Sequence, residues 1–216
     1  MKIEEARFNM IEQQIRTWNV LDTEVLAMLT IVRREEFVPA AYRSLAFADT
    51  EVPLPCGENM FPPRVEARIL QEAGVRKHET VLEIGAGSGY MAALLAHRAR
   101  HVTTVDIEPV LKSLAASNLA SYGISNVDVV LGDGARGFGS EQFDVIVISG
   151  SLPTLPDAFL QQLKIGGRLL AFIGEAPVME AQRTTRVSER DFQTEMLFET
   201  NVPALRNAEH RSHFRF

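Results

Sequence analysis

Between residues 80 and 174, strand-length apolar blocks alternate with segments of helical spacing, and this alternation constrains the fold most strongly. The blocks are rich in Val, Ile and Leu and have no polar face, which is typical of parallel strands covered on both sides. Because crossovers between parallel strands are right-handed, the order predicts a doubly wound α/β sheet. The predicted strands are residues 80–86, 101–107, 127–133, 143–150 and 168–174, and the predicted helices are residues 90–99, 109–123 and 156–167.

The chain before this core has helical spacing instead of alternation. Residues 3–18 predict one helix, and a second is expected to begin at Asp22, a residue type that favours the N-cap. A third is predicted from Pro62 and Pro63 to Gly74, with proline at its start and glycine at its end. The first 75 residues therefore predict a helical N-terminal extension that also carries a loop.

The chain after the core predicts two further strands, over residues 184–190 and 192–202, paired as an antiparallel hairpin at the sheet edge. The basic and aromatic ending is expected to be a frayed terminus, with a partner-binding tail as the alternative. The whole chain then forms one domain with a mostly parallel, seven-stranded sheet. Its predicted parts are the extension (1–75), a core (76–175), the edge hairpin (176–205) and the tail (206–216).

The composition narrows the possible partners. The net charge is −6, and the 22 Lys and Arg residues form no basic stripe, so we expect no nucleic-acid partner. No apolar run approaches the ~18 residues of a membrane span, and the acidic N-terminus is unlike a signal peptide. The single Cys56, expected to be a small buried residue, suits a cytoplasmic location. The histidines lack metal-ligand spacing, so we expect no metal; no feature predicts an oligomeric state.

The strongest chemical signal is the glycine loop in VLEIGAGSGYMAALLA, which runs from a predicted strand into a predicted helix. Its spacing is Gly85-x-Gly87-x-Gly89, whereas the dinucleotide fingerprint would place its third glycine at Tyr90. A phosphate-binding G-K-[ST] is also missing. The pattern is typical of sites for S-adenosyl-L-methionine, in which Glu83 can meet the ammonium group or order the loop.

Two more acids follow predicted strands of the same sheet. Asp106 lies ~20 residues past the loop, where a carboxylate binds ribose hydroxyls. Asp133 lies in a GDG turn, where it can accept a hydrogen bond from the adenine amino group. Parallel strands present such residues at their carboxyl ends, where ligands bind in open α/β sheets. The predicted cofactor-binding residues are Glu83, Gly85, Gly87, Ser88, Gly89, Asp106, Ile107, Asp133 and Gly134.

The chain resembles the protein-L-isoaspartate O-methyltransferase family over roughly residues 8–175. The resemblance includes the glycine loop and, more specifically, REEFVPAAYR and LAFADTEVPLPCG in the extension; the other matching stretches are MIEQQIR, VDI, LGDGARG, FDVIVISG and QLKIGGRLL. It implies a Rossmann-like methyltransferase fold of class I, S-adenosyl-L-methionine as methyl donor, and a protein or peptide carboxylate as acceptor. The implied activity is repair of isoaspartyl residues in damaged proteins.

The loop LPCGENMFPP departs from this family, in which the equivalent loop reads approximately G-x-T-I-S-x-P and places a hydroxyl at the substrate carboxylate. Asn59 stands at the threonine position and Phe61 at the serine position, while Phe172 replaces a usual proline. The predicted substrate loop is Glu58, Asn59, Met60 and Phe61. An ionised carboxylate needs no general base, and the sequence does not identify a catalytic residue.

These departures leave three hypotheses open. The first is an isoaspartyl carboxyl methyltransferase with an altered loop. The second is a methyltransferase of the same fold that acts on a different acceptor. The third is a protein that binds S-adenosyl-L-methionine or its product without turnover.

Overall fold

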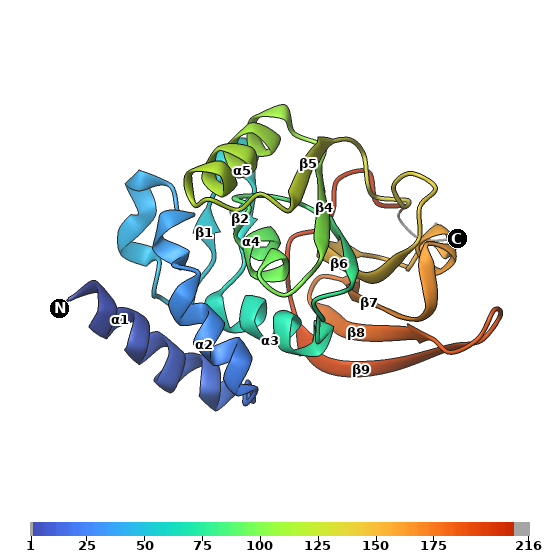
Figure 1. The fold of residues 1–216 in the computed structure, drawn as a ribbon, viewed down its shortest axis with the longest axis horizontal. Helices are drawn as coiled ribbons and strands as arrows, with labels where there is room; N and C mark the ends of the chain where they lie inside the picture. Colours follow the sequence, from blue (N-terminus) through green and yellow to red (C-terminus); the bar gives the residue numbers. More distant parts are fainter. Residues whose placement is uncertain (1, 210–216) are drawn as a thin grey trace, which may run out of the picture.

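A computed structural model describes residues 2–209, and its centre is a seven-stranded sheet of order β5-β4-β3-β6-β7-β8-β9 (Figure 1). The strands from β5 to β7 are parallel, whereas β8 and β9 pair antiparallel at one edge. The predicted fold class is therefore confirmed. The strands are β3 (Thr80–Ile84), β4 (His101–Asp106), β5 (Val127–Leu131), β6 (Phe143–Leu152), β7 (Leu163–Glu175), β8 (Val178–Arg186) and β9 (Phe192–Thr200).

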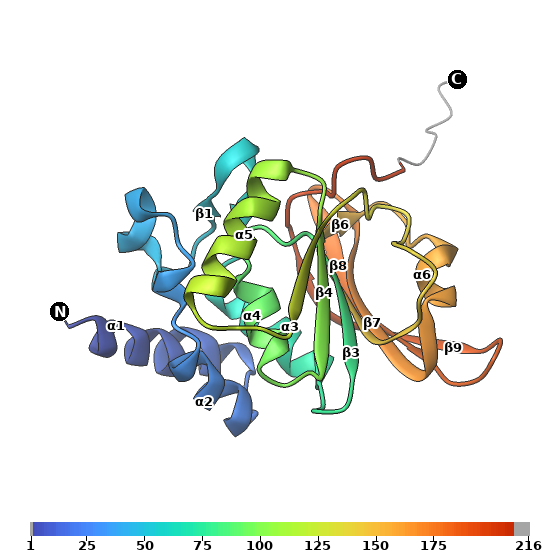
Figure 2. The ribbon, with the colours of Figure 1, turned by 45° about the horizontal axis from the view of Figure 1, so that its top comes forward.

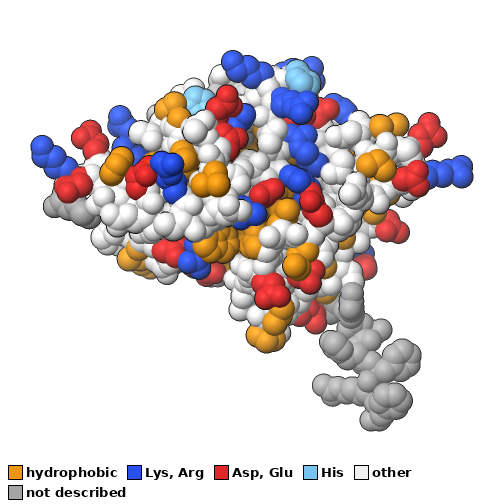
Figure 3. Space-filling model, turned by 90° about the horizontal axis from the view of Figure 1, so that it is seen from below, with side chains coloured by type: hydrophobic (Ala, Val, Ile, Leu, Met, Phe, Trp, Pro, Cys, Tyr) orange, Lys and Arg blue, Asp and Glu red, His pale blue; other side chains and the backbone are white. Residues whose placement is uncertain are grey.

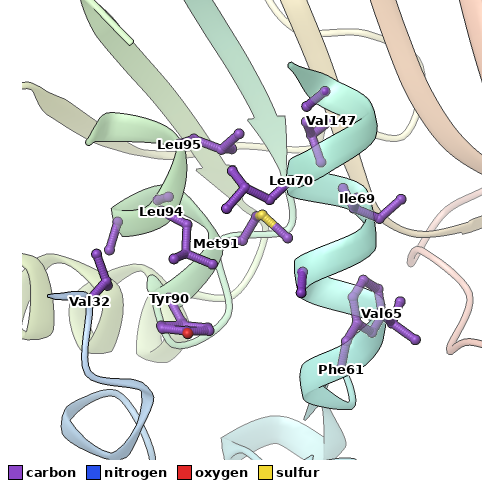
Figure 4. Packing of buried hydrophobic residues seen from close by; sticks show 14 of the residues in the cluster. Val32, Phe61, Val65, Ile69, Leu70, Tyr90, Met91, Leu94, Leu95 and Val147 are labelled. Atoms are coloured by element: carbon purple, nitrogen blue, oxygen red, sulfur yellow. The ribbon is translucent and has the colours of Figure 1, made fainter. Parts of the chain in front are cut away.

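Helices cover both faces of the sheet, as the apolar strands require. Helices α3 (Pro63–Ala73), α4 (Tyr90–Ala96) and α5 (Pro109–Ser121) lie on one face, and α6 (Asp157–Gln161) lies on the other (Figure 2). Within β3, Val81 packs in the cluster on the α4 side, whereas Leu82 packs in the cluster that contains Phe159 of α6. Figure 4 shows the first cluster between α3 and α4. This alternation buries both faces of the central strands.

Several boundaries predicted from the sequence are wrong, including the start of the strand predicted over residues 168–174, which begins at Leu163. The helix predicted over residues 156–167 ends at Gln161, because Leu163 already pairs with Phe143 and so begins β7. The glycines at 166 and 167 therefore lie inside β7, at an irregularity in its pairing with β6 where Gly166 has φ of 80°, rather than at a helix end. At the sheet edge, β8 begins at Val178, well before the predicted start of its strand.

The N-terminal extension follows the prediction closely. Helix α1 (Ile3–Asn9) continues through a π-helical turn (Met10–Ile15) and a 3₁₀ turn (Arg16–Trp18). Asp22 caps α2 (Thr23–Ile31) by accepting hydrogen bonds from the backbone N–H groups of Glu24 and Val25. Gly74 ends α3 in the left-handed region, with φ of 51°. Further 3₁₀ turns cover Arg34–Glu36, Ala40–Leu45 and Pro55–Gly57.

The ending differs from the expected frayed terminus. The Asn207 side chain donates a hydrogen bond to Asp133, and Ala208 is buried in the cluster on the α6 side, so the start of the tail packs against the sheet. Residues 210–216 of the predicted tail lie outside the described residues. The division of the chain into four parts stays a prediction.

Charged side chains of both signs are interspersed on the face seen in Figure 3. Over residues 2–209, no helix is long and apolar enough to cross a membrane.

Candidate functional site

One pocket lies at the carboxyl edge of the parallel strands, where the glycine loop, the ends of β4 and β5, the loop 54–61 and the segment 203–206 meet. This edge is where open α/β sheets bind ligands. Every predicted site residue except Gly89 lines this pocket. Gly89 instead caps α4 with φ of 83° and packs against Ala115, so its predicted contact with a cofactor stays a prediction.

The glycine loop forms a cradle that larger residues would fill. Gly85 has φ of 96°, and a Cβ atom there would lie 2.9 Å from the carbonyl oxygen of Ser149. Gly87 has φ of 52°, and its N–H donates to Asp106 Oδ2 at 2.9 Å. Glycine is therefore required both for the backbone conformation and for the close approach to β6. Ser88 is buried beside Gly87 in the same loop.

Glu83 is fully buried on β3 at the base of the pocket. It accepts hydrogen bonds from Thr104 Oγ1 at 2.6 Å and from Ser149 Oγ at 3.3 Å. Burial disfavours the charged carboxylate and raises the pKa of Glu83 to about 8, although the two hydroxyls oppose this shift. An ammonium group reaching this carboxylate would supply the missing counter-charge.

Asp106 organises the neighbouring loops through its carboxylate. Besides Gly87, the N–H of Glu108 donates to its Oδ1 at 2.9 Å. Burial raises the pKa of Asp106, while these two backbone donors lower it. A carboxylate has about four lone-pair sites, so acceptor capacity for hydroxyl groups remains. Ile107 follows Asp106 in the pocket wall.

The end of β5 supplies the third acid. Asp133 accepts from the Ala135 N–H at 3.0 Å and from Asn207 Nδ2 at 2.9 Å, and these bonds lower the pKa of Asp133. A Cβ atom on Gly134 would lie 2.7 Å from Ile84 Cγ2, so this residue brings backbone close to β3. The three predicted acids thus surround one pocket, with Glu83 on β3, Asp106 at the end of β4 and Asp133 just after β5.

The substrate loop is a small hairpin rather than a loop without strands. β1 (Val52–Pro53) pairs with β2 (Asn59–Met60), and Cys56 occupies the turn with φ of 64°. Cys56 is exposed, so its expected burial is wrong. Asn59 Nδ2 donates to Glu51 Oε2 at 3.0 Å and is therefore already engaged.

Phe61 packs against another departure from the family pattern. Its ring meets the ring of Phe172 at an interplanar angle of 77°, and both side chains are buried. In Figure 4, Phe61 lies beside Val65 at the start of α3. The buried Arg34 fixes the end of the loop, because its Nη2 donates a hydrogen bond to the Phe61 carbonyl at 2.7 Å.

Several residues of this site were not predicted from the sequence. Arg34 also donates to Glu66 Oε2 at 2.9 Å and to the Ala46 carbonyl at 2.8 Å, and Glu66 lines the pocket. Glu108 also lines the pocket. It lies two positions after Asp106, and this proximity in sequence could have identified Glu108 as a site residue. Arg206 had no such signal, because it reaches the pocket only through the fold. Among the described residues, no group of three or more His, Cys, Asp or Glu side chains could hold a metal ion.

The fold, with its glycine loop and three acids around one pocket at the carboxyl edge, is that of a Rossmann-like methyltransferase of class I. The family model "Protein-L-isoaspartate(D-aspartate) O-methyltransferase (PCMT)" matches residues 5–206, and the chain belongs to this family. The predicted family and the predicted enzyme class, an O-methyltransferase, are thereby confirmed.

Relatives agree with this assignment, and a solved structure agrees with the fold. The chain is 40% identical to a protein-L-isoaspartate O-methyltransferase of Rhodopseudomonas palustris, with 93% of each covered. It is 37% identical to one of Koribacter versatilis, over 83% of this chain and 81% of the relative. A Plasmodium falciparum structure assigned to the same enzymes, in complex with S-adenosyl-L-homocysteine, has a TM-score of 0.78. The match covers 95% of this chain and 98% of the Plasmodium chain. Because the two sequences are only 17% identical, this structure supports the fold alone.

Proposed function

We propose that this chain transfers a methyl group from S-adenosyl-L-methionine to the carboxylate of isoaspartyl residues in damaged proteins. The observation that carries the proposal is the pocket of a family member, in which the acceptor loop 54–61 faces the glycine loop and the three acids. A donor and an acceptor that bind on these two sides would meet inside one enclosure.

The residues present fit the methyl donor. An added Cβ atom would meet Ser149 at Gly85 and Leu54 at Gly87, so both positions favour glycine. Within residues 2–209 the buried Glu83 carboxylate is bonded by two hydroxyl groups and forms no ion pair. We assign Glu83 to the ammonium group, Asp106 to the ribose hydroxyls and Asp133 to the adenine amino group. When bound, S-adenosyl-L-methionine supplies the reactive methyl group and its leaving group.

The protein supplies alignment and exclusion of water rather than proton transfer. A carboxylate acceptor with a pKa of ~4 is already ionised near neutral pH. No general base is then needed, and positioning dominates the rate. One hydrogen bond to a charged group contributes about 1.5–3 kcal/mol, so the missing loop hydroxyl would cost about ten- to 150-fold in rate unless another donor replaces it.

A second candidate function is methylation of a different acceptor by the same fold. Two observations favour considering it. The Asn59 amide donates a hydrogen bond to Glu51. Phe61 occupies the position where the family has serine, and its ring is buried against Phe172. Phe61 offers no donor to an acceptor carboxylate, and Asn59 has one amide N–H left beyond its bond to Glu51. The acceptor must then bind this remaining N–H or another donor, or it must be a different group.

Methanol release separates the candidates, because methyl esters of isoaspartyl residues decompose. Purified full-length protein is incubated with labelled methyl donor and an isoaspartyl peptide, with the normal aspartyl peptide as the matched control. We expect volatile label from the isoaspartyl peptide only. If the protein binds the labelled donor but releases no methanol, the isoaspartyl activity is contradicted. The remaining hypotheses are then a methyltransferase with a different acceptor and a protein that binds the donor without turnover.

We further propose a cytoplasmic location and no nucleic-acid partner. A single cysteine and a net charge of −6 without a basic stripe support both.

A further inference from the structure

The C-terminal strap, residues 203–208, forms one wall of the pocket. The Ser151 N–H donates to the Pro203 carbonyl at 2.8 Å, and the Leu205 N–H donates to the Ser151 carbonyl at 2.9 Å. The Leu205 side chain fills the space over Gly150, where a Cβ atom would lie 2.8 Å from its Cδ2. The strap is thus fastened to the carboxyl end of β6, and four of its residues, 203–206, line the pocket.

Arg206 connects this strap to two walls of the pocket at once. Its Nε donates to Glu58 Oε1 at 2.8 Å and its Nη2 donates to the Cys56 carbonyl at 2.6 Å, both in the loop 54–61. Its Nη1 contacts the carboxylate of Glu108, beyond the end of β4. One guanidinium therefore joins the acceptor loop to the wall that carries Asp106.

Asn207 extends the strap to the third wall. Its Nδ2 donates to Asp133 Oδ2 at the end of β5. The strap thereby touches the acceptor loop, the β4 end and the β5 end. A nucleoside seated on the glycine loop between these walls would lie beneath the strap.

We propose that Arg206 is a positioning residue that holds the strap closed over the methyl donor and ties the donor seat to the acceptor loop. This inference rests on the proposed function, since it takes a nucleoside to occupy the pocket. Arg206 binds Glu58, the Cys56 carbonyl and Glu108, so it acts by fastening the strap to the two walls. Closing and opening of the strap then limit both entry and exit of the nucleoside.

A gate has a kinetic signature that distinguishes it from a direct ligand contact. Loss of a contact residue raises the dissociation rate alone. Loss of the residue that holds a gate closed raises the association and dissociation rates together, so the dissociation constant changes less than either rate. Arg206→Ala should raise both rates about ten-fold. This factor is at the low end for charge-assisted hydrogen bonds, because the Arg206 side chain is 39% exposed and solvent weakens its bonds.

The test measures both rates for S-adenosyl-L-homocysteine by stopped-flow with the full chain. Arg206→Lys should fall between the wild type and Arg206→Ala, because an ammonium group cannot form the fork of bonds that a guanidinium forms. Arg136→Ala is the matched control. It removes an exposed ion pair of 3.0 Å with Glu209, just beyond the strap, and should leave both rates within about two-fold.

Three other results would overturn the proposal. If Arg206→Ala has wild-type rates, the strap does not gate the site. If it raises the dissociation rate alone, Arg206 is an ordinary contact. If the wild type does not bind the nucleoside, both the proposed function and the gating role of the strap fail. The first two results contradict only the gating role and leave the proposed function intact. Thermal unfolding of each variant shows whether the fold is intact.

Discussion

The ring of Phe61 lies edge-on against the ring of Phe172, with 5.3 Å between the ring centroids. These residues occupy two positions at which the sequence departs from the family pattern, and the fold brings them into contact. Phe61 belongs to the acceptor loop, and Phe172 belongs to β7. The two departures therefore form one structural feature, an aromatic pair beneath the acceptor side of the pocket.

We predict that this pair is coupled energetically. Phe61→Leu and Phe172→Leu keep apolar volume but lose the edge-to-face contact. In a double-mutant cycle, their effects on the free energy of unfolding should be non-additive by about 0.5–1.5 kcal/mol. Denaturant unfolding of the four proteins measures this term, and strict additivity would show that the rings pack independently.

Phe61→Ser tests what the aromatic pair does for the reaction. If the chain is an isoaspartyl enzyme, methanol release should change modestly, although removal of a buried ring destabilises the fold by about 3–5 kcal/mol. The assay is therefore run well below the measured unfolding temperature of the variant. A wild type without activity that gains isoaspartyl activity on this substitution would show that the loop serves another acceptor.

Glu83 should make stability depend on pH. Its pKa rises from an ordinary 4.5 to about 8 in the folded protein, so the folded state holds a proton that the unfolded chain releases. The free energy of unfolding should fall as pH rises through this interval, because the folded state binds more protons there. Glu83→Gln should reduce this slope in denaturant titrations at several pH values. The exposed Glu4→Gln is the control, and equal slopes for wild type and Glu83→Gln would contradict the prediction.

The buried pair of Arg34 and Glu66 should be essential for holding the acceptor loop. Arg34→Met leaves Glu66 buried without its partner and removes the donors to the Ala46 and Phe61 carbonyls. We expect a loss of about 3–5 kcal/mol in the free energy of unfolding. Denaturant unfolding measures it, with Arg16→Ala as the control, since Arg16 forms an exposed pair with Glu12 and should cost less than about 0.5 kcal/mol. Equal stability of the two variants would refute this role.

Much of the fold was predictable because the sheet is parallel and covered on both sides. Each buried strand then appears as a continuous apolar block, and the carboxyl ends of these strands identify the edge where Glu83, Asp106 and Asp133 meet. The α6 boundary was not predictable in this way. A glycine pair reads equally as a helix end and as an irregularity in a strand, and only the pairing of Leu163 with Phe143 decides between them.

The missed parts of the site depend on contacts between distant residues. Arg206 lies 148 positions from Glu58, and no local pattern connects them. The basic ending looked like a solvated terminus because its acidic partners come from the loop and from beyond β4. The contact of Phe61 with Phe172 was hidden for the same reason. Local spacing predicts helices, strands and strand ends, whereas these contacts follow from the packed fold.

The most direct test of the account is a calorimetric titration of the full chain with S-adenosyl-L-methionine. We predict saturable binding at one site per chain, weakened about ten- to 150-fold in Asp106→Ala, which loses acceptor bonds at the proposed ribose position. Absence of any binding heat across a range of temperatures, with the protein shown to be folded, would contradict the assignment of this pocket to a methyl donor.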